Sequence, residues 1–257
     1  MIFTDTHSHL YSEQFEEDIC QVVERAVKEG VTKMIIPATA YSNYAQVEEL
    51  CAKFPDNMFA AYGLHPTDID ENTDIDFELQ KLEEQIAKGG VVAIGETGLD
   101  MYWSVEHIDK QILSLRRHFE LSIKYNLPLI IHVREAFDQI IEQLEPYRGK
   151  LRGVLHGFSG TFEQSQKILE LGDFIFGIGG VVTFKKSLLP LAVAQIPLEK
   201  IVLETDSPYL TPTPFRGKRN ESSYIPLIAK KIAEVKGIDI EVVARECEKN
   251  CKKMFVI

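Results

Sequence analysis

The run Ile2-Phe3-Thr4-Asp5-Thr6-His7-Ser8-His9-Leu10 begins as a β-rich strand and ends in two histidines. Because side chains alternate along a strand, His7 and His9 are expected to share a face, with Asp5 one step deeper. Two imidazoles side by side at the end of a strand can chelate one divalent metal ion. Surface or core histidines would explain an isolated pair better, so the interpretation depends on the rest of the chain.

Strand-like and helix-like stretches alternate from one end of the chain to the other. Eight apolar strands, each followed by a helix, predict a parallel sheet with both faces covered. Their number and the chain length favour an α/β fold of the closed (β/α)8 TIM barrel type over an open doubly wound sheet. No Gly-x-Gly-x-x-Gly follows the first strand, which argues against a dinucleotide-binding fold. We expect one domain over residues 1–257, with an extra C-terminal helix.

The expected strands cover residues 2–7, 32–38, 57–63, 91–96, 129–132, 153–156, 174–178 and 201–206. The expected helices cover residues 12–29, 42–54, 76–88, 106–126, 135–145, 162–171, 187–195, 222–236 and 239–251. The helix over 187–195 is the weakest of these because Pro190 interrupts it.

Composition limits the classes of function. The chain has 257 residues, of which 45% are hydrophobic, and a formal charge of −11. A generic nucleic-acid coat protein would be basic, so any polyanion must be held here by local positive charge or by metal. We expect a cytoplasmic protein without membrane association, because there is no signal-peptide pattern and no apolar run of roughly 18 residues. The four cysteines form no Cys-x-x-Cys pair and are expected to be small buried hydrophobes, and no obligate protein partner is evident.

Polar residues interrupt the apolar strands at their carboxyl ends, where the sites of such barrels lie. His107 and His118 instead fall on a predicted helix, where we expect solvent or packing contacts. Stacking carboxylates in a low-dielectric barrel mouth costs several kcal/mol unless a counter-charge is present, and divalent ions supply one. The strand ends supply more ligands than one tetrahedral ion needs, so two ions are plausible. These residues are His7, His9, Glu96, His132, His156 and Asp206.

The motifs around these residues resemble the TatD family of metal-dependent hydrolases, a branch of the amidohydrolase-like barrels. The matching stretches run through nearly the whole chain in order: 5–10 (DTHSHL), 63–66 (GLHP), 93–100 (AIGETGLD), 128–132 (PLIIH), 156–160 (HGFSG), 204–210 (ETDSPYL) and 216–221 (RGKRNE). One departure is Ser222, which stands where a proline usually follows in the family, in a loop expected to contact substrate.

The resemblance implies a (β/α)8 barrel with a two-metal site. In the family, the positions of the six residues named above are metal ligands, and the Glu96 position lies between the ions. Family members are described as deoxyribonucleases, some with 3′-to-5′ exonuclease activity. The resemblance implies magnesium, manganese or zinc without choosing among them.

Two divalent ions can clamp a phosphodiester and activate water for in-line attack. Asp206 and Glu96 are the candidate catalytic residues, and Asp206 would bind metal and orient or deprotonate the water. Glu204 shares the inward face of Asp206 and either supports a metal-ligating histidine or pairs with an unidentified base. Tyr102 and Trp103 could stack bases or pack as a lid. Substrate phosphate is expected to contact Arg216, Lys218 and Arg219. His65 is expected to contact a phosphate or the leaving group, unless it only caps a helix or loop, and Arg134 to contact phosphate, unless it pairs with Glu135.

Three functions compete. The leading one is a metal-dependent 3′–5′ exodeoxyribonuclease whose partner is DNA, held at short or single-stranded ends. The second is a hydrolase of an ester, amide or lactone, for example a deacylase, that uses the same binuclear site on a carbonyl. The third is a non-catalytic, metal-loaded binding protein. The basic run 216–219 favours a phosphate-bearing substrate, since a neutral one would not need three cationic side chains together.

Overall fold

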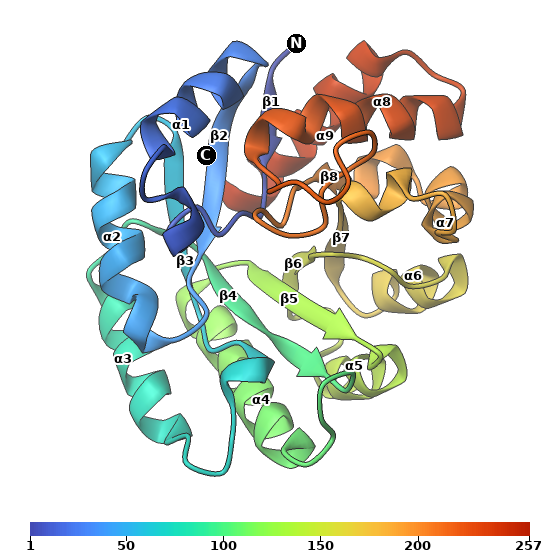
Figure 1. Ribbon diagram of the computed structural model, residues 1–257. Helices are drawn as coiled ribbons and strands as arrows, with labels where there is room; N and C mark the ends of the chain where they lie inside the picture. The colour runs from blue at the N-terminus through green and yellow to red at the C-terminus, as the bar shows by residue number, and fades with distance from the viewer.

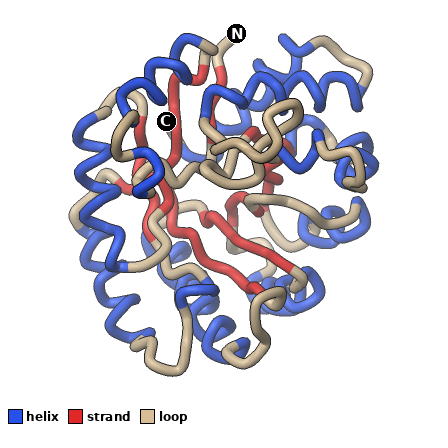
Figure 2. Tube along the Cα trace, viewed as in Figure 1, coloured by secondary structure: helices blue, strands red, loops and turns tan.

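Eight parallel strands form one sheet whose hydrogen-bonding order follows the chain from β1 to β8. The computed structural model describes residues 1–257. Helices surround the strands on the outside, as Figures 1 and 2 show. The strands are β1 (Phe3–Asp5), β2 (Val31–Pro37), β3 (Met58–Tyr62), β4 (Val91–Asp100), β5 (Leu129–Arg134), β6 (Arg152–Leu155), β7 (Asp173–Ile178) and β8 (Ile201–Leu203).

The first and last strands come together and bring the sheet to a nearly closed barrel. The Thr6 amide donates to the Leu203 carbonyl at 3.0 Å, and Ser8 forms a parallel bridge with Ser207. The predicted TIM-barrel architecture is therefore confirmed. Both strands are shorter than expected, so His7 and His9 lie just beyond β1 instead of on it.

The helices match the predicted order. The largest difference lies in the first one, where a short 3-10 turn over Glu13–Phe15 replaces the beginning of the helix expected over 12–29. The helices are α1 (Ile19–Lys28), α2 (Tyr44–Lys53), α3 (Ile75–Ala87), α4 (Ile108–Tyr125), α5 (Phe137–Leu144), α6 (Phe162–Leu169), α7 (Leu189–Gln195), α8 (Ile225–Lys236) and α9 (Ile240–Phe255). The last of these is the predicted extra helix. No helix in the chain combines the length and the apolar character needed to cross a membrane.

Alternation along the strands separates two apolar layers. In β2, Met34 and Ile36 pack in the larger cluster with the surrounding helices, whereas Ile35 packs in a smaller inner cluster. That inner cluster takes one residue from each of seven strands and is completed by the last turns of α9, through Cys251, Met254 and Phe255. A barrel interior filled in this way is a packed core, so it leaves chemistry to the strand ends.

Two of the four cysteines are buried as expected, whereas Cys20 is exposed and Cys51 is half-buried. All four are free, and Cys247 and Cys251 are buried on α9. Burial raises the pKa of the Cys251 thiol to about 12, so it stays protonated and packs as an apolar group.

Candidate metal centre

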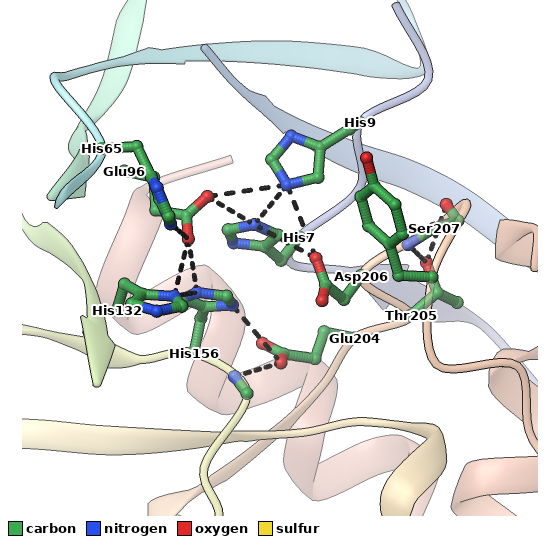
Figure 3. A network of polar contacts seen from close by, with 12 residues as sticks. His7, His9, His65, Glu96, His132, His156, Glu204, Thr205, Asp206 and Ser207 are labelled. Carbon is green, nitrogen blue, oxygen red and sulfur yellow. Dashed lines mark hydrogen bonds and ion pairs between the residues drawn. The ribbon is translucent and has the colours of Figure 1, made fainter. Parts of the chain in front are cut away.

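Histidine and carboxylate side chains meet at the carboxyl ends of the strands, around Glu96 (Figure 3). They come from segments far apart in the chain. His7 and His9 follow β1, Glu96 lies in β4, and Asp206 lies beyond β8. All six residues predicted as metal ligands fall within this one cluster, with His65 beside them: His7, His9, His65, Glu96, His132, His156 and Asp206.

The two carboxylate oxygens of Glu96 face different sets of histidines. Oε2 lies 3.1 Å from His7 Nε2 and 3.5 Å from His9 Nε2. The other oxygen faces three imidazoles from other strands, so the carboxylate stands between two groups of nitrogen donors. Oε1 lies 3.0 Å from His65 Nε2, 3.2 Å from His132 Nδ1 and 2.6 Å from His156 Nε2.

Glu96 points into this cluster because β4 is irregular. The register of β4 against β5 shifts between Ile94 and Thr97. Ile94 packs in the outer apolar layer, and a regular strand would place the side chain two residues later on that same face. An irregularity of this kind re-aims a side chain and is frequent beside active sites. Here it turns the carboxylate inward.

Asp206 is positioned by a backbone conformation that few residues adopt. Its φ is 56°, in the left-handed region, where aspartate is tolerated better than most residues. Its amide donates to the His7 carbonyl at 2.9 Å, and its Oδ1 lies 3.4 Å from His9 Nε2. Strain of this kind often collects at functional positions, where the surrounding structure holds it in place.

Burial and neighbouring charge push the pKa values in the centre apart. Burial opposes the charge of Glu96, but the surrounding imidazoles hold its pKa well below its usual range. Burial also opposes the charge of Asp206, yet the hydrogen bond from His9 keeps its pKa low. Burial lowers the pKa of His7 to about 4, which leaves its imidazole neutral and able to act as a ligand. Burial raises the pKa of Glu204 well above its usual range.

Glu204 lies beneath His156, as one of its two predicted roles requires. Its Oε1 lies 3.8 Å from His156 Nδ1 and accepts a hydrogen bond from the Gly157 amide. Gly177 leaves the room that the carboxyl occupies, because a Cβ there would come within 1.9 Å of Oε2. No base pairs with Glu204, so the arrangement supports the role beside a metal-ligating histidine.

Asp100 is a functional neighbour that the sequence patterns did not reveal. Its Oδ2 lies 3.0 Å from His132 Nε2, whereas Glu96 Oε1 lies against the other ring nitrogen, Nδ1. Burial opposes its charge, but the hydrogen bond from His132 lowers its pKa, so it accepts as a carboxylate. The predicted strand over 91–96 stopped before this residue, whereas β4 continues to Asp100. If the strand had been extended by four residues, Asp100 would have been recognised as a second carboxylate after Glu96 on the same strand.

His65 donates to Glu96 and caps the turn that follows β3. Its Nδ1 accepts from the Thr67 amide at 3.1 Å, and burial lowers its pKa, so the neutral ring carries its proton on Nε2. That proton points to Glu96 Oε1. The preceding residue, Leu64, is held by His118, whose Nε2 accepts from the Leu64 amide at 3.1 Å. His118 is thus a packing residue, as expected for its place on α4.

The predicted phosphate-binding loop is only partly available to a ligand. The guanidinium of Arg216 lies 3.8 Å from the centre of the Phe184 ring. Arg219 is paired with the residue that precedes α1 and donates to Asp18 Oδ1 at 2.8 Å and Oδ2 at 2.7 Å. A phosphate contact by Arg219 would require these bonds to break. Lys218 borders a pocket of about 550 Å³ together with Arg219.

Ser222 is part of a buried hydrogen-bond network and does not lie on the surface. Its hydroxyl donates to Asp5 Oδ2 at 2.7 Å, and the Thr205 hydroxyl donates to the same oxygen at 2.6 Å. Asp5 therefore faces β8 and the 3-10 turn that precedes α8. The side chain of Ser222 is fully buried, so this residue itself presents no surface to a substrate.

The donor set fits divalent metal ions. Three overlapping groups each hold ligand atoms within 4.8 Å of one another. Glu96 Oε2 is buried without a hydrogen-bond partner, and His7 Nε2 and His9 Nε2 face each other at 3.1 Å. Imidazole and carboxylate donors together suit zinc, manganese or iron. The groups are His7, His156 and Asp206; His7, His9 and Glu96; and His65, Glu96 and His132.

The barrel and this donor set define the class of metal-dependent hydrolases, and comparison with known proteins agrees. Residues 4–256 match the family described as TatD related DNase, and the chain belongs to that family. The chain is 37% identical over its full length to the full-length metal-dependent hydrolase YabD of Bacillus subtilis. It is 34% identical to the 3′-5′ ssDNA/RNA exonuclease TatD of Pantoea ananatis, with 98% of each chain covered. The crystal structure of the Escherichia coli TatD homologue YjjV superposes with a TM-score of 0.91 at 29% identity, covering 99% of this chain and 98% of that one.

Proposed function

We propose that this metal-dependent hydrolase is a 3′–5′ exodeoxyribonuclease that binds two divalent ions on either side of Glu96. The observation that carries the proposal is the orientation of the Glu96 carboxylate, whose two oxygens face two separate sets of imidazoles. His7, His9 and Asp206 would hold one ion, and His132 and His156 the other, with Glu96 shared. Magnesium, manganese and zinc are all compatible with these donors.

The chain's own residues would do the following in hydrolysis. Bound divalent ions would supply charge to neutralise a phosphodiester and to acidify a water molecule. Asp206 is ionised and lies at the mouth of the centre, where it would orient the attacking water and accept its proton. His65 would hold the shared carboxylate through its Nε2 hydrogen, and Glu204 would support His156 from below.

Phosphate contacts are proposed for Arg134, Arg216 and Lys218. Arg134 belongs to the same strand as His132, two residues further on, and so reaches the mouth of the barrel. An acidic chain that binds nucleic acid through a few such contacts would hold a strand end rather than coat a duplex. The exonuclease named among the relatives supports nucleic acid as the substrate class.

The test uses a 5′-labelled single-stranded oligodeoxynucleotide and metal-stripped protein. Mg²⁺, Mn²⁺ and Zn²⁺ are added in turn, and products are resolved at single-nucleotide length. The proposal predicts a ladder that shortens from the 3′ end with at least one metal and is lost in Asp206→Asn. Absence of cleavage with every metal, together with turnover of an aryl ester or a lactone by the same samples, would replace the nuclease with a carbonyl hydrolase.

A further inference from the structure

Two aromatic side chains are exposed directly beyond the end of β4. Tyr102 is 49% exposed and Trp103 is 70% exposed. Their rings meet edge to face, with centroids 5.0 Å apart. The guanidinium of Arg134 lies 3.7 Å from the centre of the Tyr102 ring and 5.5 Å from that of Trp103. Exposed aromatic rings beside a cationic group are what unpaired nucleobases stack on in proteins that bind single strands.

One buried carboxylate connects this aromatic surface to the metal centre. Asp100 Oδ1 accepts from the Tyr102 amide at 3.0 Å and from the Trp103 amide at 3.2 Å. Its other oxygen, Oδ2, lies 3.0 Å from His132 Nε2. The same side chain therefore shapes the aromatic segment and holds a candidate metal ligand.

Asp100 is held firmly in the position from which it contacts both the aromatic segment and His132. Its side chain is 2% exposed. Gln111 of α4 holds its backbone from both directions: the Asp100 amide donates to Gln111 Oε1 at 3.0 Å, and Gln111 Nε2 donates to the Asp100 carbonyl at 3.3 Å. The Asp100 carboxylate is thus held between the aromatic segment and His132.

The carboxylate also decides which nitrogen of His132 is free. An acceptor at Nε2 keeps the ring proton on that nitrogen, because a carboxylate cannot donate. Nδ1 is then left with its lone pair directed to the centre, 3.2 Å from Glu96 Oε1 and 3.1 Å from His156 Nε2. Partners of this kind orient a ligating histidine, and their loss typically costs about 10- to 100-fold in metal affinity.

We propose that Tyr102, Trp103 and Arg134 form a stacking subsite for an unpaired nucleobase, and that Asp100 couples its occupancy to the metal ligand His132. The inference rests on the proposed nuclease function, because it takes single-stranded nucleic acid as the ligand. A base seated on the aromatic pair orders the segment whose amides hold Asp100. It thereby strengthens metal binding, and bound metal strengthens base stacking by the same factor.

The stacking part is tested by fluorescence, because Trp103 is the only tryptophan in the chain. Metal-free protein is titrated with tetrathymidylate and, separately, with an abasic tetramer that keeps the phosphates. We expect the first to quench Trp103 and the second to leave its emission unchanged. Equal effects of the two ligands, or no quenching by either, would overturn the subsite.

The coupling part is tested by calorimetric titration with Mn²⁺, with and without tetrathymidylate whose phosphorothioate linkages resist cleavage. In the wild-type protein we expect this ligand to tighten Mn²⁺ binding by about 5-fold or more beyond the effect of the matching abasic ligand. Asp100→Asn preserves the acceptor for the Tyr102 and Trp103 amides but presents N–H to His132 Nε2, which shifts the ring proton to Nδ1. We expect this variant to lose about 10-fold or more in Mn²⁺ affinity and all of the base-dependent tightening, while tetrathymidylate still quenches Trp103.

Asp56→Asn is the matched control, because Asp56 is exposed in the turn before β3, at the opposite end of the barrel. If Asp100→Asn kept both the wild-type Mn²⁺ affinity and the base-dependent tightening, the coupling would be refuted.

These measurements require no turnover, so they test the inference separately from the proposed nuclease activity. Base-dependent quenching without cleavage of unmodified DNA would refute only the nuclease, and cleavage without quenching would refute only the subsite.

Discussion

Asp206 Oδ1 lies 3.4 Å from His9 Nε2, across the seam where the last strand of the barrel meets the first. The two residues are 197 positions apart in the sequence, yet the seam places them at one centre. Backbone hydrogen bonds hold it, including the one from the His9 amide to the Ser207 carbonyl at 2.7 Å. The metal centre is therefore complete only when the barrel is closed.

Asp206→Asn should remove hydrolysis while the protein stays folded. Asparagine keeps the size of the side chain but neither carries the charge nor accepts a proton from water. We expect the rate constant at saturating metal to fall by about 10² to 10⁴. The measurement is kcat on a single-stranded oligonucleotide, with circular dichroism as the check on folding and Asp56→Asn as the control. A kcat within about threefold of wild type would show that Asp206 is not the proton acceptor.

Divalent metal should stabilise the fold, because its ligands come from both sides of the seam. At a free Mn²⁺ concentration about 100 times the dissociation constant, one site adds about 2.7 kcal/mol to the free energy of unfolding. Urea unfolding with and without Mn²⁺ measures this increment. Glu96→Gln removes the carboxylate that we propose to be shared, so Mn²⁺ should raise the free energy of unfolding of this variant by much less. An unchanged increment in Glu96→Gln would place the metal elsewhere.

Acid should destabilise the fold partly through His118. Burial lowers its pKa from 6.5 to about 4 in the folded protein. Between these two values the unfolded chain binds a proton that the folded chain does not, so stability falls as pH falls. Each pH unit in that window costs up to about 1.4 kcal/mol for this group. Urea unfolding from about pH 7.5 to about pH 4.5 should give a shallower pH dependence in His118→Gln, and the same slope in both proteins would contradict this origin.

Arg134→Gln should weaken the hold on DNA without changing the chemical step. We expect a higher KM for a single-stranded oligonucleotide and a similar kcat. The slope of log KM against log salt concentration should fall by about 0.7 for each phosphate that the variant no longer binds. Arg245, exposed on α9, provides the control Arg245→Gln. If both variants showed the wild-type salt slope, Arg134 would not bind phosphate.

The barrel and most of the candidate ligands were predictable for one physical reason. Strands buried on both faces are apolar runs, so His132 and His156 at the ends of such runs stand out against their neighbours. Asp100 did not stand out, because β4 continues through Thr97 and Gly98, beyond the point where its apolar run ends.

Other features depend on tertiary contacts that no local pattern encodes. The inward orientation of Glu96 follows from a register shift, whereas alternation alone would point it outward. Arg219 was grouped with its basic neighbours in the sequence. In the structure its guanidinium instead donates to Asp18, which lies 201 positions earlier. The sequence around Ser222 indicates a loop residue, and only the fold shows that its hydroxyl donates to Asp5.

The position of bound metal relative to Glu96 decides whether this carboxylate is shared between two ions. Crystals grown with Mn²⁺ and measured at the manganese absorption edge would locate each ion by anomalous scattering. We predict two peaks, one on the Oε2 side of Glu96 near His7 and His9, and one on the Oε1 side near His132 and His156. A single peak, or peaks away from Glu96 at saturating Mn²⁺, would contradict a shared carboxylate.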